Sequence, residues 1–151
     1  MKWLLDTNVV SETAKRRPNE HVLSWLAKQP PEEFAISHIT VAELQTGAST
    51  RLDEERRREL VVWIDATVGT WFADRCLPCT VEILTDWLLL ARQLAANGMT
   101  RQSPDLLIAA TARVHNLTVV TRNVRDFANT GVAVYDPWTG KTHHLDAPDA
   151  R

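Results

Sequence analysis

Four carboxylates are the side chains of this sequence with the clearest capacity for joint chemistry. They are spread through the chain as Asp6, Glu43, Asp105 and Asp126. Each follows a predicted strand or opens a predicted helix, so all four are expected at one edge of one sheet. Packing like charges together is costly unless a cation neutralises them, and oxygen ligands of this kind suit Mg²⁺ or Mn²⁺ rather than zinc. Such ions would clamp a phosphate, lower the pKa of a bound water and stabilise a leaving oxygen.

Each carboxylate also has an ordinary structural interpretation when it is taken alone. Asp6 suits the N-cap of a following helix, and Glu43 fits a capping box that begins at Thr40. Asp105 lies in the first turn of a predicted helix, where the helix dipole favours an acid. Asp126 can be a loop acid that pairs with a neighbouring arginine. The joint placement of the four acids, rather than any one of them, indicates a metal site.

The elements that must position these acids alternate between short apolar runs and longer helical patterns. Strands are predicted at 2–5, 34–36, 76–77, 118–120 and 132–135. Helices are predicted at 9–14, 20–28, 41–48, 52–68, 81–95 and 104–114. This alternation predicts an α/β fold with a parallel sheet and right-handed crossovers. Sites in such sheets form beyond the carboxyl ends of the strands, which is where the acids are expected.

Two of the predicted helices have apolar faces that we expect to be buried. In the helix at 52–68, the expected face is made by Leu60, Val61, Ile64 and Val68. In the helix at 81–95, it is made by Val81, Leu84, Leu88, Ala91 and Ala95. Trp63 and Trp87 lie on the same two helices and are candidates for contact with a protein partner.

Composition describes an ordinary soluble domain. The chain has 151 residues with a formal net charge of -2, and 44% of its residues are hydrophobic. One domain is therefore expected, and nucleic-acid binding by bulk charge alone is disfavoured, although local basic patches or bound metal ions remain compatible. The first apolar stretch is broken at Asp6, and no run approaches the ~20 apolar residues of a membrane helix. These features predict a cytoplasmic protein.

The two cysteines, Cys76 and Cys79, form a C-x-x-C pattern. This spacing can serve a redox dithiol or half of a zinc site. A zinc site needs four ligands, and no second cysteine pair or close histidine pair follows. We therefore favour a pair of small, partly buried side chains on a strand and its exit turn.

The order of several segments resembles the PIN-domain ribonucleases, specifically the VapC/FitB-like toxins of bacterial toxin–antitoxin pairs. The similar segments are 4–12 (LLDTNVVSE), 39–44 (ITVAEL) with Gly47, 104–112 (PDLLIAATA), 120–127 (VTRNVRDF) and 136–138 (DPW). Each segment is weak evidence alone, but their order and spacing are specific. The resemblance covers residues 1–138 as a nuclease domain and leaves 139–151 as a polar tail that we expect to fray.

The resemblance implies a three-layer α/β/α sandwich around a central parallel sheet. It implies an active site in which Asp6, Glu43, Asp105 and Asp126 hold Mg²⁺ or Mn²⁺, and a metal-activated water that hydrolyses RNA phosphodiesters. It also implies a homodimer and a cognate VapB-like antitoxin. The antitoxin would block the site and supply DNA binding, so that DNA is contacted only indirectly.

Polar and basic residues flank the four acids. Thr7, Asn8, Thr121 and Asn123 are predicted to orient the acids or the water, and turn and cap chemistry is an equally good interpretation of them. Phosphate-binding candidates are Arg101, Arg122 and Arg125, with the basic run 15–17 after the Asp6 segment.

Three alternatives stay open at this point. The chain can be a non-catalytic PIN-fold module that binds RNA or a protein. It can be a haloacid-dehalogenase-like phosphatase, although Asn8 stands where that motif needs a second Asp. It can also be a redox protein that uses Cys76 and Cys79.

Overall fold

The computed structural model describes residues 1–100 and 103–147. Its strands are β1 (Trp3–Leu5), β2 (Phe34–Ser37), β3 (Cys76–Leu77), β4 (Thr118–Val120), β5 (Ala133–Asp136) and β6 (Lys141–His144). Its α-helices are α1 (Thr7–Glu12), α2 (Glu20–Lys28), α3 (His38–Ser49), α4 (Glu54–Ala66), α5 (Val81–Ala96) and α6 (Pro104–His115). Three shorter turns are η1 (Pro31–Glu33), the π-helical η2 (Thr67–Trp71) and η3 (Val124–Phe127). No helix in the described ranges is long and apolar enough to cross a membrane.

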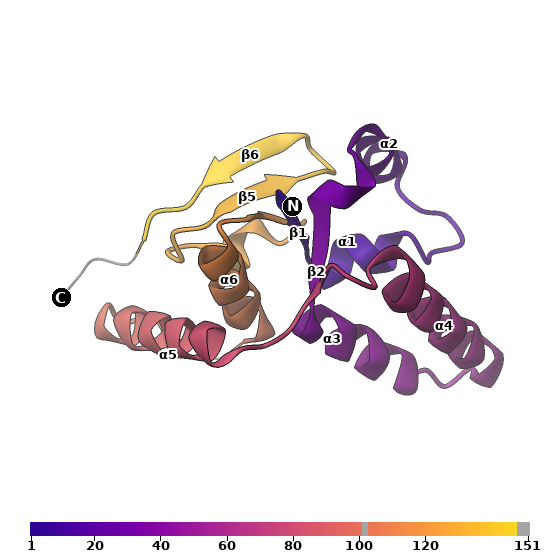
Figure 1. Ribbon diagram of the computed structural model, residues 1–151, viewed down its shortest axis with the longest axis horizontal. Helices are drawn as coiled ribbons and strands as arrows, with labels where there is room; N and C mark the ends of the chain where they lie inside the picture. Colours follow the sequence, from indigo (N-terminus) through magenta and orange to yellow (C-terminus); the bar gives the residue numbers. More distant parts are fainter. Residues whose placement is uncertain (101–102, 148–151) are drawn as a thin grey trace.

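The strands form one six-stranded sheet in the order β3-β2-β1-β4-β5-β6. The pairs from β3 to β5 are all parallel, and only β6 runs antiparallel to its neighbour β5. The chain leaves β1 toward one edge of the sheet and returns to the other side of β1 at β4 (Figure 1). Ligand sites in an open parallel sheet lie beyond the carboxyl ends of the strands at such a reversal. Asp6 follows β1 directly at this position.

Successive strand residues point to opposite faces of the sheet, and each face has its own core. Leu4 and Val119 belong to a core that also contains residues of α5 and α6. Leu5 and Val120 belong to a second core that contains residues of α1, α2, α3 and α4. Helices therefore cover both faces, and the predicted three-layer α/β/α sandwich is confirmed.

Two helices begin earlier than the sequence pattern predicts, because a polar residue at the end of the preceding strand caps each of them. The Asp6 side chain accepts from the Thr7 amide, so α1 starts at Thr7. Ser37 caps α3 by accepting from the Thr40 amide. The predicted capping box is therefore wrong, and Glu43 lies in the second turn of α3. Helix capping does not explain an acid at this position.

The predicted buried face of α5 is also wrong. The buried residues are Ile83, Leu90 and Leu94, and Trp87 packs against the same core. Much of the predicted face is exposed instead, at Val81, Leu84 and Leu88, and Leu89 is exposed beside it. This helix carries apolar residues on more than one face, so hydrophobicity cannot select the buried one. Packing of α5 against α6 makes the selection.

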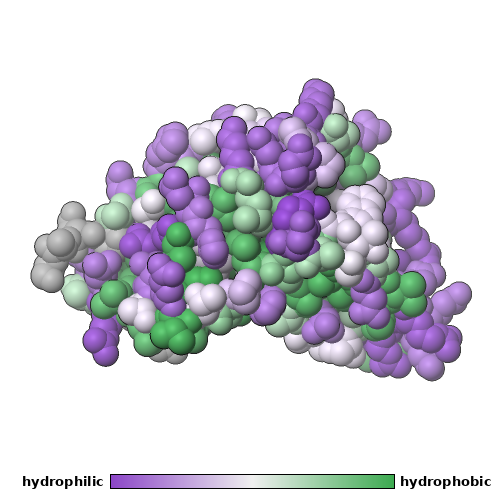
Figure 2. Space-filling model, in the orientation of Figure 1, coloured by the Kyte–Doolittle hydropathy of each residue, from purple (hydrophilic) through white to green (hydrophobic). Residues whose placement is uncertain are grey.

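The long helix predicted at 52–68 is shorter and less buried than expected. Asp53 caps α4, which ends at Ala66 and continues into the π-helical turn η2. Ile64 is buried as predicted, whereas Val61 is 46% exposed. Figure 2 shows apolar surface along the lower edge of the molecule, in the region of α5 and α4.

The expectation that residues 139–151 fray is wrong for the segment that forms β6. This strand pairs antiparallel with β5 over Lys141–His144. Without β6, the edge of β5 would present unpaired backbone donors and acceptors. The side chains of β6 are mostly exposed, which is why this polar sequence gives little sign of a strand.

Candidate active site

Asp6 lies at the carboxyl end of β1 and is 3% exposed. Its Oδ1 accepts from the Thr7 amide at 2.7 Å. Its Oδ2 accepts from Asn8 Nδ2 at 2.9 Å and from the Thr121 hydroxyl at 2.6 Å. All three donors are neutral, so the carboxylate is oriented by its surroundings without being neutralised by them.

Thr121 joins the ends of β1 and β4 around this carboxylate. Its side chain is fully buried, and its Oγ1 accepts from Asn8 Nδ2 at 2.9 Å and from the Asn123 amide at 3.0 Å. Of the four polar residues predicted to flank the acids, Asn8 and Thr121 therefore reach Asp6 by their side chains. Asn123 contributes only its backbone amide, which donates to the Thr121 hydroxyl as part of a turn.

Glu43 is positioned by the attachment of α3 to β1. The Thr40 hydroxyl donates to the Leu5 carbonyl at 3.4 Å, beside the end of β1. The Thr7 hydroxyl donates to Glu43 Oε2, so the residue after Asp6 also orients the second acid. The hydrogen-bonding pattern of Thr40 was not predicted from the sequence, in which this residue is equally well suited to be a helix cap.

Burial, with a smaller contribution from a neighbouring acid, raises the pKa values of Asp6 and Glu43. Burial raises the pKa of Asp6, the charge of Glu43 raises it further, and the donors Thr121, Thr7 and Asn8 only partly offset this. Burial also raises the pKa of Glu43, with a further rise from the charge of Asp105 and a partial offset from Thr7. Asp6, Glu43 and Asp105 therefore form a chain of mutually repelling carboxyls.

The other two predicted acids lie near the same edge of the sheet. Asp105 is in the first turn of α6, and α6 packs against α3. Asp126 is exposed in η3, which packs against α6 and β5. Asp136 also ends a strand, but its oxygens accept from the Trp138 amide and the Thr139 hydroxyl, each at 2.9 Å. A turn therefore already uses the carboxylate of Asp136.

The donor set suits a hard divalent cation. It consists of oxygens only, and a cation would relieve the repulsion that raises the pKa values of Asp6 and Glu43. Among residues 1–100 and 103–147, no three acidic, histidine or cysteine side chains are gathered closely enough to hold an ion. Convergence of the carboxylates would have to accompany binding of the cation that offsets their repulsion.

The basic residues predicted at the site are only partly within the described ranges. Arg122 and Arg125 are exposed just after β4, and residues 15–17 are exposed between α1 and α2. The Arg122 amide donates to Asn8 Oδ1 at 3.2 Å, and its guanidinium lies 5.6 Å from the centre of the Trp138 ring. Arg101 lies outside the described residues.

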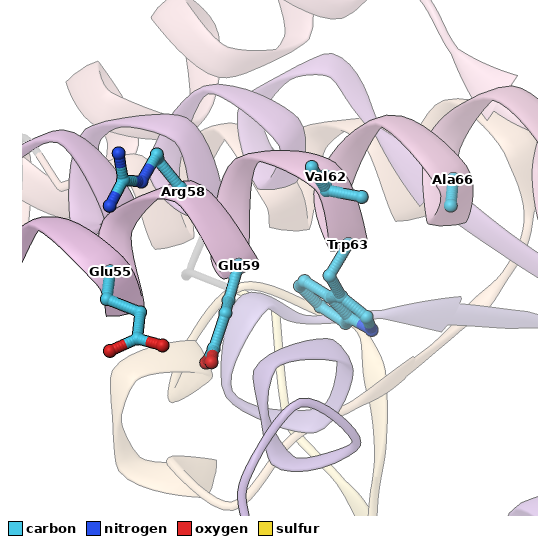
Figure 3. Close-up of a pocket in the computed structure, with 6 residues that line it drawn as sticks. All are labelled: Glu55, Arg58, Glu59, Val62, Trp63 and Ala66. Atoms are coloured by element: carbon cyan, nitrogen blue, oxygen red, sulfur yellow. The ribbon is translucent and has the colours of Figure 1, made fainter.

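Of the hollows found in residues 1–100 and 103–147, two are lined mainly by helices. A groove of about 600 Å³ runs beside Glu43, and its walls come from α3, α5 and α6 through residues that include Ile39, Trp87 and Leu107. A second hollow of about 650 Å³ lies along one side of α4, at Glu55, Arg58, Glu59, Val62, Trp63 and Ala66 (Figure 3). Only the first adjoins one of the predicted metal ligands.

Comparison with known proteins shows the family of this chain. The model of the PIN domain family matches residues 3–133. Toxin FitB of Neisseria gonorrhoeae is 36% identical over 135 residues, which cover 89% of this chain and 97% of FitB. The chain belongs to the PIN-domain family. A VapC ribonuclease of Sinorhizobium fredii, Y4jK, is 34% identical over 135 residues, 89% of this PIN domain and 96% of that protein.

Solved structures similar to this PIN domain include toxin–antitoxin complexes. A crystal structure of FitAcB from Neisseria gonorrhoeae has a TM-score of 0.80 at 35% identity and covers 90% of this chain and 98% of that one. A structure of FitAB bound to a DNA fragment has a TM-score of 0.83 at 34% identity, with 94% and 99% covered. A DNA-bound VapBC from Salmonella typhimurium has a TM-score of 0.77 at 28% identity, with 91% and 98% covered.

The cysteines of this PIN domain lie at the edge of the sheet. Cys76 begins β3 and packs against the second core, and both cysteines are free and partly buried. Burial raises the pKa of the Cys76 thiol, which lowers its thiolate fraction and hence its reactivity. These observations favour the packing interpretation of the C-x-x-C pattern over the redox one.

Proposed function

We propose that this PIN domain is a metal-dependent endoribonuclease and the toxin of a toxin–antitoxin pair. The observation that carries the proposal is Asp6, a buried carboxylate whose raised pKa reflects burial and a neighbouring acid. Such a site is costly to maintain without a cation. The names of the similar proteins, which include a toxin and VapC ribonucleases, support the choice of RNA as the substrate.

In this proposal, Asp6, Glu43 and Asp105 hold the first Mg²⁺ or Mn²⁺, and Asp126 completes the acidic set or serves a second ion. When bound, the ion would supply Lewis acidity that favours ionisation of water and offsets charge on the phosphate. Asn8 and Thr121 hold Asp6 Oδ2 in place, and Thr7 holds one oxygen of Glu43. These contacts orient the carboxylates of Asp6 and Glu43, and binding of the ion would have to bring them and Asp105 together.

The test is cleavage of a labelled single-stranded RNA by the purified chain with Mg²⁺, with Mn²⁺ and with EDTA. We expect cleavage with either metal and none with EDTA. The Asp6→Asn variant should not cleave, whereas the matched control Asp65→Asn, at an exposed acid of α4, should cleave as the parent does. Equal cleavage by the parent and Asp6→Asn would contradict the metal–carboxylate mechanism, and no cleavage by the parent would favour the non-catalytic PIN-fold module.

We also propose a homodimer and a VapB-like antitoxin as protein partners, with DNA bound through the antitoxin. Exposed apolar side chains on α5, at Val81, Leu84, Leu88 and Leu89, are compatible with burial against a partner. Light scattering should give twice the chain mass for the purified protein. Adding the antitoxin, sought in the reading frame immediately upstream, should stop cleavage. A monomeric mass, or unchanged cleavage with that antitoxin bound, would contradict the respective part of this proposal.

A further inference from the structure

Glu12 is a buried carboxylate that the proposed metal chemistry does not use. It is the last residue of α1 and is 4% exposed. Its Oε2 accepts from Lys15 Nζ at 2.6 Å, and its Oε1 accepts from the Asn19 amide at 2.9 Å. Both oxygens are therefore engaged, and one of them is paired with a cation.

The two contacts of Glu12 fasten the basic segment between α1 and α2. This segment contains Lys15, Arg16 and Arg17, all exposed. A further contact comes from α4, where Arg56 Nη2 donates to the Ala14 carbonyl at 2.7 Å. A run of three cations would repel itself and extend into solvent if nothing held it. In this structure the segment is held on one side by the contacts of Lys15 and Ala14 and on the other by the contact of the Asn19 amide.

Arg122 is the second cation near Glu12. Burial works to raise the pKa of Glu12, but donation by Lys15 and the Asn19 amide, together with the charges of Lys15 and Arg122, holds this pKa below its usual value. The guanidinium of Arg122 lies over the Trp138 ring. Glu12 is therefore ion-paired with Lys15, and the charge of Arg122, which comes from a distant part of the chain, also favours the ionised form of Glu12.

Glu12, Lys15 and Arg122 are connected to the proposed catalytic site through the backbone of Arg122. The Arg122 amide donates to Asn8 Oδ1, and Asn8 Nδ2 donates to Asp6 Oδ2. The same chain segment therefore carries a cation and is fixed relative to Asp6. A phosphate bound by that cation would be fixed relative to the acids as well.

We infer that Glu12 is a positioning residue that holds Lys15 and attracts Arg122, so that the two cations form a binding site for an RNA phosphate flanking the one that is cleaved. The inference rests on the proposed nuclease function. Two cations held beside one carboxylate keep a net charge of about +1 while their mutual repulsion is offset. The exposed Lys15 and Arg122 can then contact a phosphodiester, and the buried Glu12 cannot.

The charge of Glu12 gives the inference a sharp test, because a simple electrostatic effect has the opposite sign. Removing a negative charge near an RNA-binding surface should tighten RNA binding if the acid only repels the phosphates. If Glu12 positions the two cations, Glu12→Gln should weaken binding, because the amide no longer offsets their repulsion or pairs with Lys15. The Gln side chain can still accept from the Asn19 amide, so the fold should be retained.

Binding is measured by fluorescence anisotropy of a fluorescein-labelled single-stranded RNA, with all variants made in the full-length Asp6→Asn chain. We expect Kd to rise about tenfold for Arg122→Ala, the loss of one charged hydrogen bond, and about threefold to tenfold for Glu12→Gln. The slope of log Kd against log salt should fall by about one for each phosphate that a variant no longer binds. The exposed pair Glu54 and Arg58, 3.7 Å apart on α4, provides the controls Glu54→Gln and Arg58→Ala, which should leave Kd unchanged.

Two further measurements separate positioning from a structural role. Glu12→Asp, which keeps the charge, should recover part of the affinity. Glu12→Gln should have no further effect on Kd in a Lys15→Ala/Arg122→Ala background, because Glu12 acts only through these cations. Three outcomes for Glu12→Gln would each overturn the inference. The first is tighter or unchanged RNA binding, and the second is an additive effect on Kd in the Lys15→Ala/Arg122→Ala background. The third is a lower melting temperature with an unchanged slope of log Kd against log salt. RNA cleavage by the Asp6→Asn chain would instead contradict the proposed nuclease function.

Discussion

Asp6 and Glu12 lie at the two ends of the same short helix, α1, Asp6 as its N-cap and Glu12 as its last residue. Both are almost completely buried. Burial raises the pKa of Asp6, whose hydrogen-bond donors are neutral and whose charged neighbour is the acid Glu43. Glu12 receives a hydrogen bond from Lys15 and has Arg122 nearby, so its pKa is lowered. Two buried carboxylates six positions apart are thus in opposite electrostatic environments.

The difference distinguishes two uses of a buried acid. A carboxylate with cationic neighbours is already compensated, and it can hold other groups in place. A carboxylate oriented by neutral donors and surrounded by acids lacks this compensation, and a bound cation would supply it. On this basis the end of β1 is a binding site for a cation, whereas the end of α1 is a support for basic residues.

The largest expected effect is the separation of activity from stability at Asp6. The Asp6→Asn variant should lose RNA cleavage to the background rate, because it removes a proposed metal ligand. Without metal, its melting temperature should equal or exceed that of the parent, because a poorly compensated buried charge is gone. Calorimetry in EDTA, paired with the cleavage assay, checks both. A strong loss of stability would show that Asp6 is mainly structural and would remove the contrast with Glu12.

A smaller loss of activity is expected from Thr7→Val, which removes the hydroxyl that donates to Glu43. Loss of a group that orients a metal ligand typically costs about 10–100-fold. Because the Thr7 hydrogen bond lowers the pKa of Glu43, its loss should move the acidic limb of the pH–rate profile to higher pH. The control Thr13→Val removes a hydroxyl that donates within α1, to the Val10 carbonyl, and should leave the profile in place.

At Glu12 the expected effect is on stability. Glu12→Ala leaves Lys15 and the Asn19 amide without their acceptor and should lower the free energy of unfolding by about 1–3 kcal/mol. Urea denaturation measures the change. Glu12→Gln keeps an acceptor for the amide and should cost less. If Glu12→Ala were as stable as the parent, the supporting role of this acid would be contradicted.

The smallest expected effect is a difference in pH dependence without metal. The folded-state pKa of Asp6 is raised, so its contribution to stability is present below the unfolded pKa, about 3.9, and is lost as pH rises through the folded value. The folded-state pKa of Glu12 is lowered, so its contribution is present above the unfolded pKa, about 4.3, and is lost as pH falls through the folded value.

Denaturation of the metal-free protein in EDTA across the acidic to neutral range checks this opposition. Compared with the parent, Asp6→Asn should lose less stability as pH rises, and Glu12→Gln should lose less as pH falls. Parallel curves for the parent and both variants would show that the two acids do not differ in this way.

The sequence predicted several elements closely where turn or polar residues mark the ends of the element. The bounds of β3, β4 and α2 agree with prediction, and Asp6 follows β1 as expected. Prediction was least reliable where several residues compete for one role. Both Ser37 and Thr40 can cap α3, and α5 has apolar residues on several faces. Only contact with the rest of the protein decides between such choices.

What the sequence determined by itself is the chemistry that is available: four carboxylates that follow predicted strands or open predicted helices, with hydroxyl and amide side chains near two of them, Asp6 and Asp126. Their spacing also indicated the PIN-domain family. The tertiary structure decided which acids affect one another, because a pKa depends on burial and on charges brought together from distant parts of the chain. It also decided that Glu12 is buried and that the charge of Arg122, distant in the chain, acts on it, a relation that its local sequence does not reveal.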